Sequence, residues 1–190
     1  MPSSTALPTI REAHMSDAAA LAELSRRTFT DTFAAGNTPD DLAMFLHATY
    51  GEVIQRQELA SSHLMYFLAE VQGLPVAYVL LRHGKPSPFV DDPTAVEIQR
   101  LYVDRAVHGT GLAQRMMDEC VRIATLRGAA SLFLGVWEHN ARALRFYAAQ
   151  GFVPVGQQGF MLGNDPQTDL VMHRTLGDSR DILKASCAAR

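Results

Sequence analysis

Apolar residues recur at helical spacing in the first third of the chain. A short β-rich segment at residues 9–13 comes first, and Ser16 is placed to cap a helix that begins at Asp17. Further helices are predicted over residues 37–50 and 51–62. The positions that mark the apolar face of the first helix are Leu21, Leu24, Thr28 and Phe29.

The remainder of the chain alternates between β-rich runs and amphipathic segments. The expected strands are residues 63–71, 75–83, 95–103, 131–137, 151–162 and 168–176. The expected helices are residues 112–127 and 140–150. Residues 84–94 and 163–167 are rich in proline, glycine and polar residues, and are predicted to be a surface loop and a turn. This order predicts a mixed α/β domain with one central sheet over residues 1–176, followed by a tail over 177–190.

Composition narrows the class of protein without naming a function. The 190 residues carry a formal net charge of −3 and no basic stripe, so nucleic acid is not an expected partner. No apolar run reaches the roughly 18 residues of a membrane helix, and the start lacks the order of a signal peptide, so a cytoplasmic protein without a membrane partner is expected. The two cysteines and seven histidines show no metal-ligand spacing, so no metal is expected.

The segment HGTGLA at residues 108–113 lies where a strand passes into a helix. It lacks the Gly-Lys-Ser/Thr of a P-loop and the third glycine of a dinucleotide fingerprint. Amides at a helix N-terminus still offer a site for phosphates. The segment resembles the pyrophosphate loop of the GNAT acyltransferases, (Gln/Arg)-x-x-Gly-x-(Gly/Ala). His108, Gly111 and Ala113 occupy its three fixed positions, and His108 departs from the Gln or Arg of the pattern.

A second segment, LGVWEHNARALRFYAAQGFVPVG, resembles the later half of the same superfamily signature. The resemblance spans roughly residues 9 to 176. It implies the GNAT fold, a mixed central sheet whose two central strands splay apart and are flanked by helices, with acetyl-CoA as co-substrate. The residues that it implies for coenzyme binding are Leu101, Tyr102, Val103, His108, Gly109, Thr110, Gly111, Leu112, Ala113, Asn140 and Tyr147.

Acetyl transfer to an amine needs a group that removes a proton from nitrogen and one that protonates the departing thiolate. The resemblance implies Tyr147 as the acid and Glu97 as the base, with Glu97 expected on the same strand face as Val103. Glu97 alternatively serves as an ordinary surface carboxylate or attracts a cationic substrate. The sequence lacks GxSxG, and neither cysteine has a histidine partner by motif, so direct attack without an acyl-enzyme is expected.

Within the superfamily the chain is most similar to the PaiA-type bacterial spermidine/spermine N-acetyltransferases, on segments such as EIQRLYV and GNDPQTDLVM. That implies a small-molecule amine, namely a polyamine. The alternatives are an amino-acid or antibiotic N-acetyltransferase, a protein N-acetyltransferase, and a non-catalytic acyl-CoA-binding regulator. Edge strands near the last hairpin are compatible with a homodimer. The residues considered for binding a polyamine are Asp31, Phe33, Asp165 and Asp169.

Overall fold

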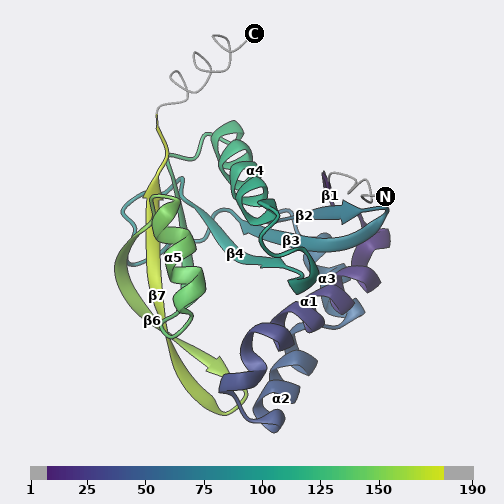
Figure 1. Ribbon diagram of the computed structural model, residues 1–190. Coiled ribbons are helices and arrows are strands. Elements are labelled where there is room, and N and C mark those ends of the chain that lie inside the picture. Colours follow the sequence, from purple (N-terminus) through teal and green to yellow (C-terminus); the bar gives the residue numbers. More distant parts are fainter. Residues whose placement is uncertain (1–7, 178–190) are drawn as a thin grey trace. The chain divides into compact units, whose positions relative to one another are not determined.

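A computed structural model describes residues 8–177 (Figure 1). Its seven strands form one mixed sheet in the order β1-β2-β3-β4-β5-β7-β6. The strands are β1 (Thr9–Glu12), β2 (Leu64–Val71), β3 (Leu74–Arg82), β4 (Val96–Val103), β5 (Ser131–Trp137), β6 (Val153–Leu162) and β7 (Asp165–Thr175). The helices are α1 (Ala18–Phe33), α2 (Pro39–Thr49), α3 (Glu52–Leu59), α4 (Leu112–Leu126) and α5 (Ala141–Ala149), with 3-10 turns η1 (Met15–Asp17), η2 (Ala34–Gly36) and η3 (Arg105–Val107).

The chain divides into two compact units, each built from three segments. Unit 1 contains Met1–Leu81, Arg100–Met117 and Met161–Pro166, and unit 2 contains Arg82–Gln99, Asp118–Phe160 and Gln167–Arg190. The expected division into a domain over 1–176 and a tail over 177–190 stays a prediction, because residues 178–190 lie outside the described part.

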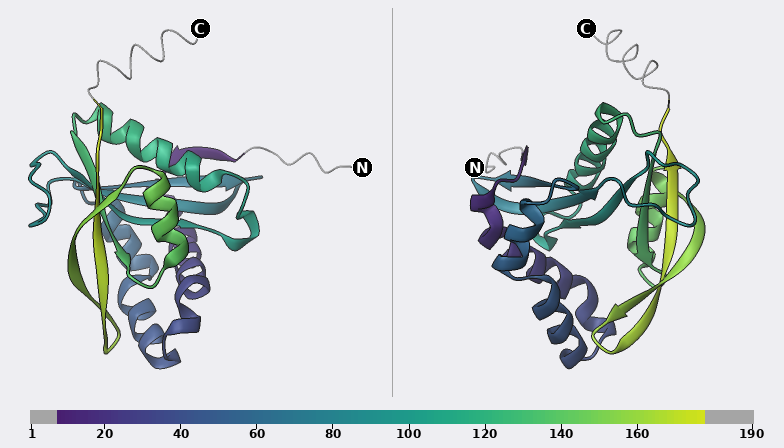
Figure 2. Two further views of the ribbon diagram at one scale, coloured as in Figure 1. Left: turned by 60° about the vertical axis from the view of Figure 1, so that its left-hand side comes forward. Right: turned by 180° about the vertical axis from the view of Figure 1, so that it is seen from behind.

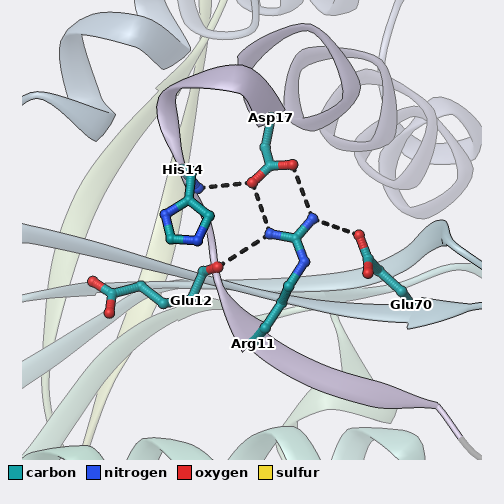
Figure 3. A network of polar contacts seen from close by, with 5 residues as sticks. All are labelled: Arg11, Glu12, His14, Asp17 and Glu70. Atoms are coloured by element: carbon teal, nitrogen blue, oxygen red, sulfur yellow. Dashed lines mark hydrogen bonds and ion pairs between the residues drawn. The ribbon is translucent and has the colours of Figure 1, made fainter.

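The start of α1 differs from the expected cap at Ser16. The turn η1 precedes the helix, and the carboxylate of Asp17 accepts a hydrogen bond from the backbone N–H of His14 at 2.7 Å. Arg11 on β1 donates to both oxygens of Asp17 at 2.8 and 2.9 Å and to Glu70 on β2 at 2.6 Å (Figure 3). Asp17 therefore links the start of α1 to β1 through an ion pair with Arg11. The uncharged Ser16 could not form this ion pair.

Unit 1 buries one face of its strands against α1. Tyr78 and Leu80 on β3 are fully buried and belong to the same apolar cluster as Leu21 and Leu24 of α1. Residues two apart on a strand share a face, so Arg82, which follows Leu80 by two, is on that face of β3 as well. The full cluster is Ala13, Leu21, Leu24, Tyr66, Leu68, Tyr78 and Leu80, with Leu59, Leu64 and Tyr102 packed against it.

Unit 2 contains the start of β4, the parallel neighbour β5 and the antiparallel strand β7. Val96 pairs with Leu132 and Glu97 pairs with Phe133, and β5 pairs along its whole length with β7 from Ser131–Thr175 to Trp137–Asp169. In this unit α5 lies over one face of β6 and β7, and the loop that follows β3 lies on the opposite face (Figure 2). Val90 of that loop packs against Phe133 and Val171.

The last hairpin turns more tightly than expected. Strand β7 begins at Asp165, so the turn is the pair Gly163–Asn164 rather than residues 163–167. Gly163 has a φ of +62°, and a methyl group there would lie 2.5 Å from the Cα of Asp41 on α2. The side chain of Asp41 accepts from the backbone N–H of Asn164 at 2.7 Å. Glycine supplies both the left-handed backbone and the close approach that allow a two-residue turn here.

Candidate active site

Strand β4 contributes residues to both units. In unit 1, Tyr102 stacks on Tyr78 of β3 with ring centroids 5.6 Å apart. In unit 2, Glu97 accepts from Arg82 at 2.6 Å. The expectation that Glu97 shares a strand face with Val103 stays a prediction, because the two residues belong to different units.

The loop after β4 presents backbone N–H groups to solvent. Asp104 caps η3 by accepting from the N–H of Ala106 at 2.9 Å, and Thr110 donates to the carbonyl of Val107 at 2.8 Å. Gly109 and Gly111 have φ angles of +78° and +80°, which turn successive amides outward. Within residues 8–177, the N–H groups of Gly109, Thr110 and Gly111 have no hydrogen-bond acceptor. Helix α4 starts at Leu112, so its unsatisfied N-terminal amides continue the row.

His108 does not direct its ring at this row of amides. A ring nitrogen lies 2.9 Å from the backbone carbonyl of Val103, and the backbone N–H donates to the carbonyl of Arg105. The side chain thus braces the loop against the end of β4. An anion held here would rely on the amides of Gly109–Ala113 and on the positive end of α4, with no cation from position 108.

Asn140 is the cap of α5. Its Oδ1 accepts from the N–H of Ala143 at 3.1 Å, and its own N–H donates to the carbonyl of Trp137 at 2.9 Å. The side-chain Nδ2 has no acceptor among the described residues. Asn140 therefore caps α5 through Oδ1. The two N–H groups of Nδ2 remain available to a carbonyl of an extended ligand.

Tyr147 lies two turns further along α5 in an apolar environment. Its ring is 8% exposed and packs edge-on against Phe152 at 5.8 Å. Burial, with a smaller contribution from Cys120, raises the pKa of this phenol above its ordinary value, so the group holds its proton at neutral pH. Its hydroxyl has no hydrogen-bond partner among the described residues. Burial also raises the pKa of Cys120, which leaves that thiol a poor nucleophile.

Glu97 is a buried carboxylate with two cations. Its side chain is 7% exposed, and it pairs with Arg82 at 2.5 Å and with Lys85 at 3.4 Å. It is therefore not the surface carboxylate that the sequence left open. Two cations already engage its carboxylate oxygens, so these oxygens are not open to a substrate ammonium.

Asp169 is the second carboxylate on the Glu97 face of the sheet in unit 2. It pairs with Trp137 at the end of β5, and Glu97 pairs with Phe133 four residues earlier on the same strand. A methyl group at Gly135 would lie 3.1 Å from Oδ2 of Asp169 and 2.7 Å from Nε2 of Gln158. The carboxylate thus occupies the space left by a missing side chain. Desolvation raises its pKa to about 6.

The other three residues considered for substrate binding lie in unit 1 and differ in kind. Asp31 is exposed on the last turn of α1, and Phe33 is 9% exposed with its ring 4.4 Å from that of Phe29. Phe33 is therefore a core residue rather than an exposed ring for a cation. Asp165 is the first residue of β7 and is half-buried.

One buried polar cluster was not expected from the sequence. Arg100 donates to Glu58 at 2.9 Å and to the hydroxyl of Tyr66 at 2.7 Å, and its guanidinium lies 5.1 Å from the centroid of the Tyr50 ring. All four residues belong to unit 1. The only signal for it in the sequence is an arginine inside a β-rich segment, and the partners are 34 to 50 residues away in the chain.

Two features are absent from residues 8–177. No three or more His, Cys, Asp or Glu side chains gather where a metal ion could be held. Over the same residues, no helix combines the length and the apolar character needed to span a membrane.

Comparison with known proteins gives consistent matches. Residues 19–152 match the family described as "Acetyltransferase (GNAT) family". An uncharacterized N-acetyltransferase in the pepI 3′ region of Lactobacillus delbrueckii subsp. lactis is 33% identical over 153 residues, which cover 80% of this chain and 88% of the relative. The N-alpha-acetyltransferase RimI of Mycobacterium tuberculosis is 35% identical over 101 residues, which cover 53% of this chain and 59% of RimI.

Among solved structures, the PaiA N-acetyltransferase of Thermoplasma acidophilum in complex with coenzyme A aligns with a TM-score of 0.73. The alignment covers 89% of this chain and 99% of that one. Identity is 17%, so this similarity extends to the fold and not to the substrate.

Proposed function

Because the chain belongs to the GNAT acetyltransferase family and is an acetyl-CoA-dependent N-acetyltransferase, we propose that it acetylates a polyamine such as spermidine or spermine by direct attack. The single observation that carries the mechanism is the row of free amides from Gly109 to Ala113. Gly109, Thr110 and Gly111 are exposed and their N–H groups have no acceptor among the described residues, and the first amides of α4 follow them. They would hold the pyrophosphate of the coenzyme.

The remaining coenzyme contacts follow the chain from this loop. The backbone of Leu101, Tyr102 and Val103 would pair with the pantetheine arm, and Nδ2 of Asn140 would donate to one of its carbonyls. The coenzyme supplies an acetyl thioester, whose carbonyl carbon is the point of attack. An amide near the end of β4 would stabilise the charge that develops on the carbonyl oxygen.

Tyr147 would act as the acid that protonates the departing thiolate. Its raised pKa keeps the proton on the phenol, and its hydroxyl is free of competing partners among the described residues. Cys120 does not support an acyl-enzyme, because its thiol is buried and protonated. Attack by the amine on the thioester therefore occurs in one transfer.

Polyamine specificity rests on the resemblance of the sequence to the PaiA type and on the carboxylates available to a long cation. Asp31 is exposed and Asp165 and Asp169 are half-buried, so each can meet an ammonium group. Phe33 lacks the exposure that a cation–π contact needs. Asp31 and the two β7 carboxylates are thus the residues proposed to select a polyamine.

The test is acetylation of a panel of amines, read by product mass. The panel contains spermidine, spermine, free amino acids and a peptide with a free α-amino group. Mono-acetylated spermidine or spermine at a rate above all other acceptors supports the proposal. Tight binding of acetyl-CoA without turnover of any amine would instead identify a non-catalytic regulator.

A protein N-terminal acetyltransferase is the second candidate, and one observation favours it. The RimI relative, an N-alpha-acetyltransferase, is 35% identical over its matched segment. Preference for the peptide α-amine over spermidine in the same panel would decide for this reading. An α-amino group has a pKa of about 7.7–8.0, so its rate should fall less steeply below pH 9 than that of a polyamine.

A further inference from the structure

We infer that Asp169, rather than Glu97, accepts the proton of the attacking amine. The inference rests on the proposed N-acetyltransferase function. It names the base of that reaction from the contacts of unit 2, where both carboxylates and the proposed acid Tyr147 lie.

The first argument is position along β5. Trp137 is the last residue of this strand, and Asp169 is its cross-strand partner. Asn140, which would bind the pantetheine arm, follows Trp137 by three residues, and its N–H donates to the Trp137 carbonyl. The backbone N–H of Glu138 donates to the carbonyl of Thr168, which precedes Asp169 in the chain. Asp169 therefore lies at the end of β5 from which the proposed coenzyme-binding segment departs.

Glu97 lies at the other end of the same face. It is paired with Phe133, and four residues at about 3.3 Å each place it about 13 Å from the level of Trp137. A base must reach the amine proton directly or through one water. An amine bound at the Trp137 end of β5 would be beyond the reach of Glu97.

The second argument is the face of the sheet on which Asp169 lies. Cross-strand partners share a face, so Asp169, Gly135 and Val171 are on one side of unit 2. That side also carries the loop with Val90, whereas α5 with Tyr147 lies over the other side (Figure 2). Asp169 and α5 therefore lie on opposite faces of the strands of unit 2, and the carboxylate is not a hydrogen-bond partner of the Tyr147 phenol.

The third argument is the state of the carboxylate itself. The absent side chain at Gly135 opens the space that the carboxylate of Asp169 occupies. Within residues 8–177 its oxygens meet no hydrogen-bond donor and no cation, in contrast to Glu97 with Arg82 and Lys85. Lone pairs that no group engages are available to a substrate ammonium.

The groups around Asp169 are uncharged. Strand β5 contributes Gly135 and Trp137, and β6 contributes the amide of Gln158. On β7 the neighbours on the same face are Gln167 and Val171, and the nearest titratable residues of this strand on that face are Asp165 and His173, each four residues away. Desolvation alone raises the pKa of Asp169, to about 6, which leaves it ionised at neutral pH and able to take up a proton.

The step balances as follows. The carboxylate of Asp169 takes one proton from the ammonium, and the freed lone pair forms the N–C bond at the thioester carbonyl. The C–S bond breaks with its electron pair on sulfur, and the phenol of Tyr147 gives sulfur its proton. The nitrogen then loses a second proton, which passes through solvent to the Tyr147 phenolate and restores the phenol. Asp169 then releases its proton, so one proton per turnover enters solution.

The experiment measures kcat/KM against pH from 5 to 9 for the wild type, Asp169→Asn, Glu97→Gln and Asp169→Glu, with the amine that the wild type acetylates best. The matched control is Glu52→Gln, which removes an exposed carboxylate paired with Arg56. The wild type should lose activity as pH falls through about 6, because its base becomes protonated. Asp169→Asn should lower kcat by on the order of 10²–10⁴-fold and abolish that limb. Asp169→Glu should recover part of the rate. Glu97→Gln and Glu52→Gln should keep the loss of activity at low pH that the wild type shows.

The outcomes distinguish a failure of the proposed function from a failure of the inference about Asp169. A wild type that binds acetyl-CoA but acetylates no amine would remove the proposed function and the inference with it. An active wild type with an equally active Asp169→Asn would remove the inference alone. The inference is also overturned if Asp169→Asn is slower at every pH but retains the acid limb, or if Glu97→Gln is the variant that loses it.

Discussion

Gly111 is the position where a small change tests the coenzyme site most directly. Its φ is +80°, and a methyl group there would meet no atom of the described residues within 4 Å. Gly111→Ala therefore adds no clash inside the protein, and its cost is that of an L-residue in a left-handed conformation. That cost is roughly 1–2 kcal/mol.

Gly128, which ends α4, provides a matched control. Its φ is +76° and a methyl group there also meets nothing within 4 Å, so Gly128→Ala carries the same backbone cost outside the loop. Both variants should have a lowered Tm. Only Gly111→Ala should weaken coenzyme binding, because either the loop leaves its amide-exposing conformation or the methyl group enters the phosphate position.

The assay follows thiol release at saturating amine while acetyl-CoA is varied. If the 1–2 kcal/mol is needed to restore the binding conformation, KM for acetyl-CoA rises about 5- to 30-fold in Gly111→Ala. It should stay at the wild-type value in Gly128→Ala. Equal KM values for the two variants, with equally lowered Tm, would show that the amides after Val103 do not hold the pyrophosphate.

Five further variants test four individual residues. Tyr147→Phe should lower kcat by roughly 10²-fold with KM for acetyl-CoA nearly unchanged, and full activity would remove the phenol from the reaction. Asn140→Asp should keep the Tm of the wild type but raise KM for acetyl-CoA, because it retains the helix cap and loses the N–H donors; Asn140→Ala should also lose about 1 kcal/mol of stability in urea unfolding. Glu97→Gln should lower stability by roughly 1–3 kcal/mol, since Arg82 and Lys85 lose their acceptor, and a Tm equal to the wild type would contradict the ion-pair role. Asp169→Asn should raise Tm at pH 7.5, and the gain should shrink as pH falls from 6 and vanish below about pH 3. The fold raises the pKa of Asp169 from 3.8 to about 6, so the cost of ionisation is full above pH 6, declines between the two pKa values and is zero once both states are protonated.

Hydrophobic periodicity predicted the elements well where the signal is local. The helix expected over residues 112–127 is α4 (Leu112–Leu126), and the strand expected over 131–137 is β5 (Ser131–Trp137). The mixed α/β fold and the GNAT family are confirmed. Both rest on motifs in which the residue types and their spacing are read directly from the chain.

Features that depend on distant partners could not be predicted in this way. Period-two alternation cannot reveal that Glu97 is a buried ion-pair partner, because Arg82 and Lys85 come from the preceding strand and loop. Ser16 is a good cap by residue type, yet it lies inside the turn η1. Asp17 holds the cap position of α1, and its carboxylate accepts from Arg11 and from the N–H of His14 instead of capping the helix. The two-residue turn at Gly163–Asn164 likewise depends on Asp41, more than 100 residues earlier.

The same limit applies to the choice of a base. By residue type Glu97 and Asp169 are equivalent, and the motif singles out the first. Their surroundings differ: Glu97 has Arg82 and Lys85 within 3.4 Å, and Asp169 has no cation among the described residues. A carboxylate whose oxygens are engaged by two cations stabilises the sheet and is not open to a substrate ammonium. A carboxylate that is desolvated and unpaired costs the fold stability above pH 6, and that cost is the property that allows it to gain and release a proton near neutral pH.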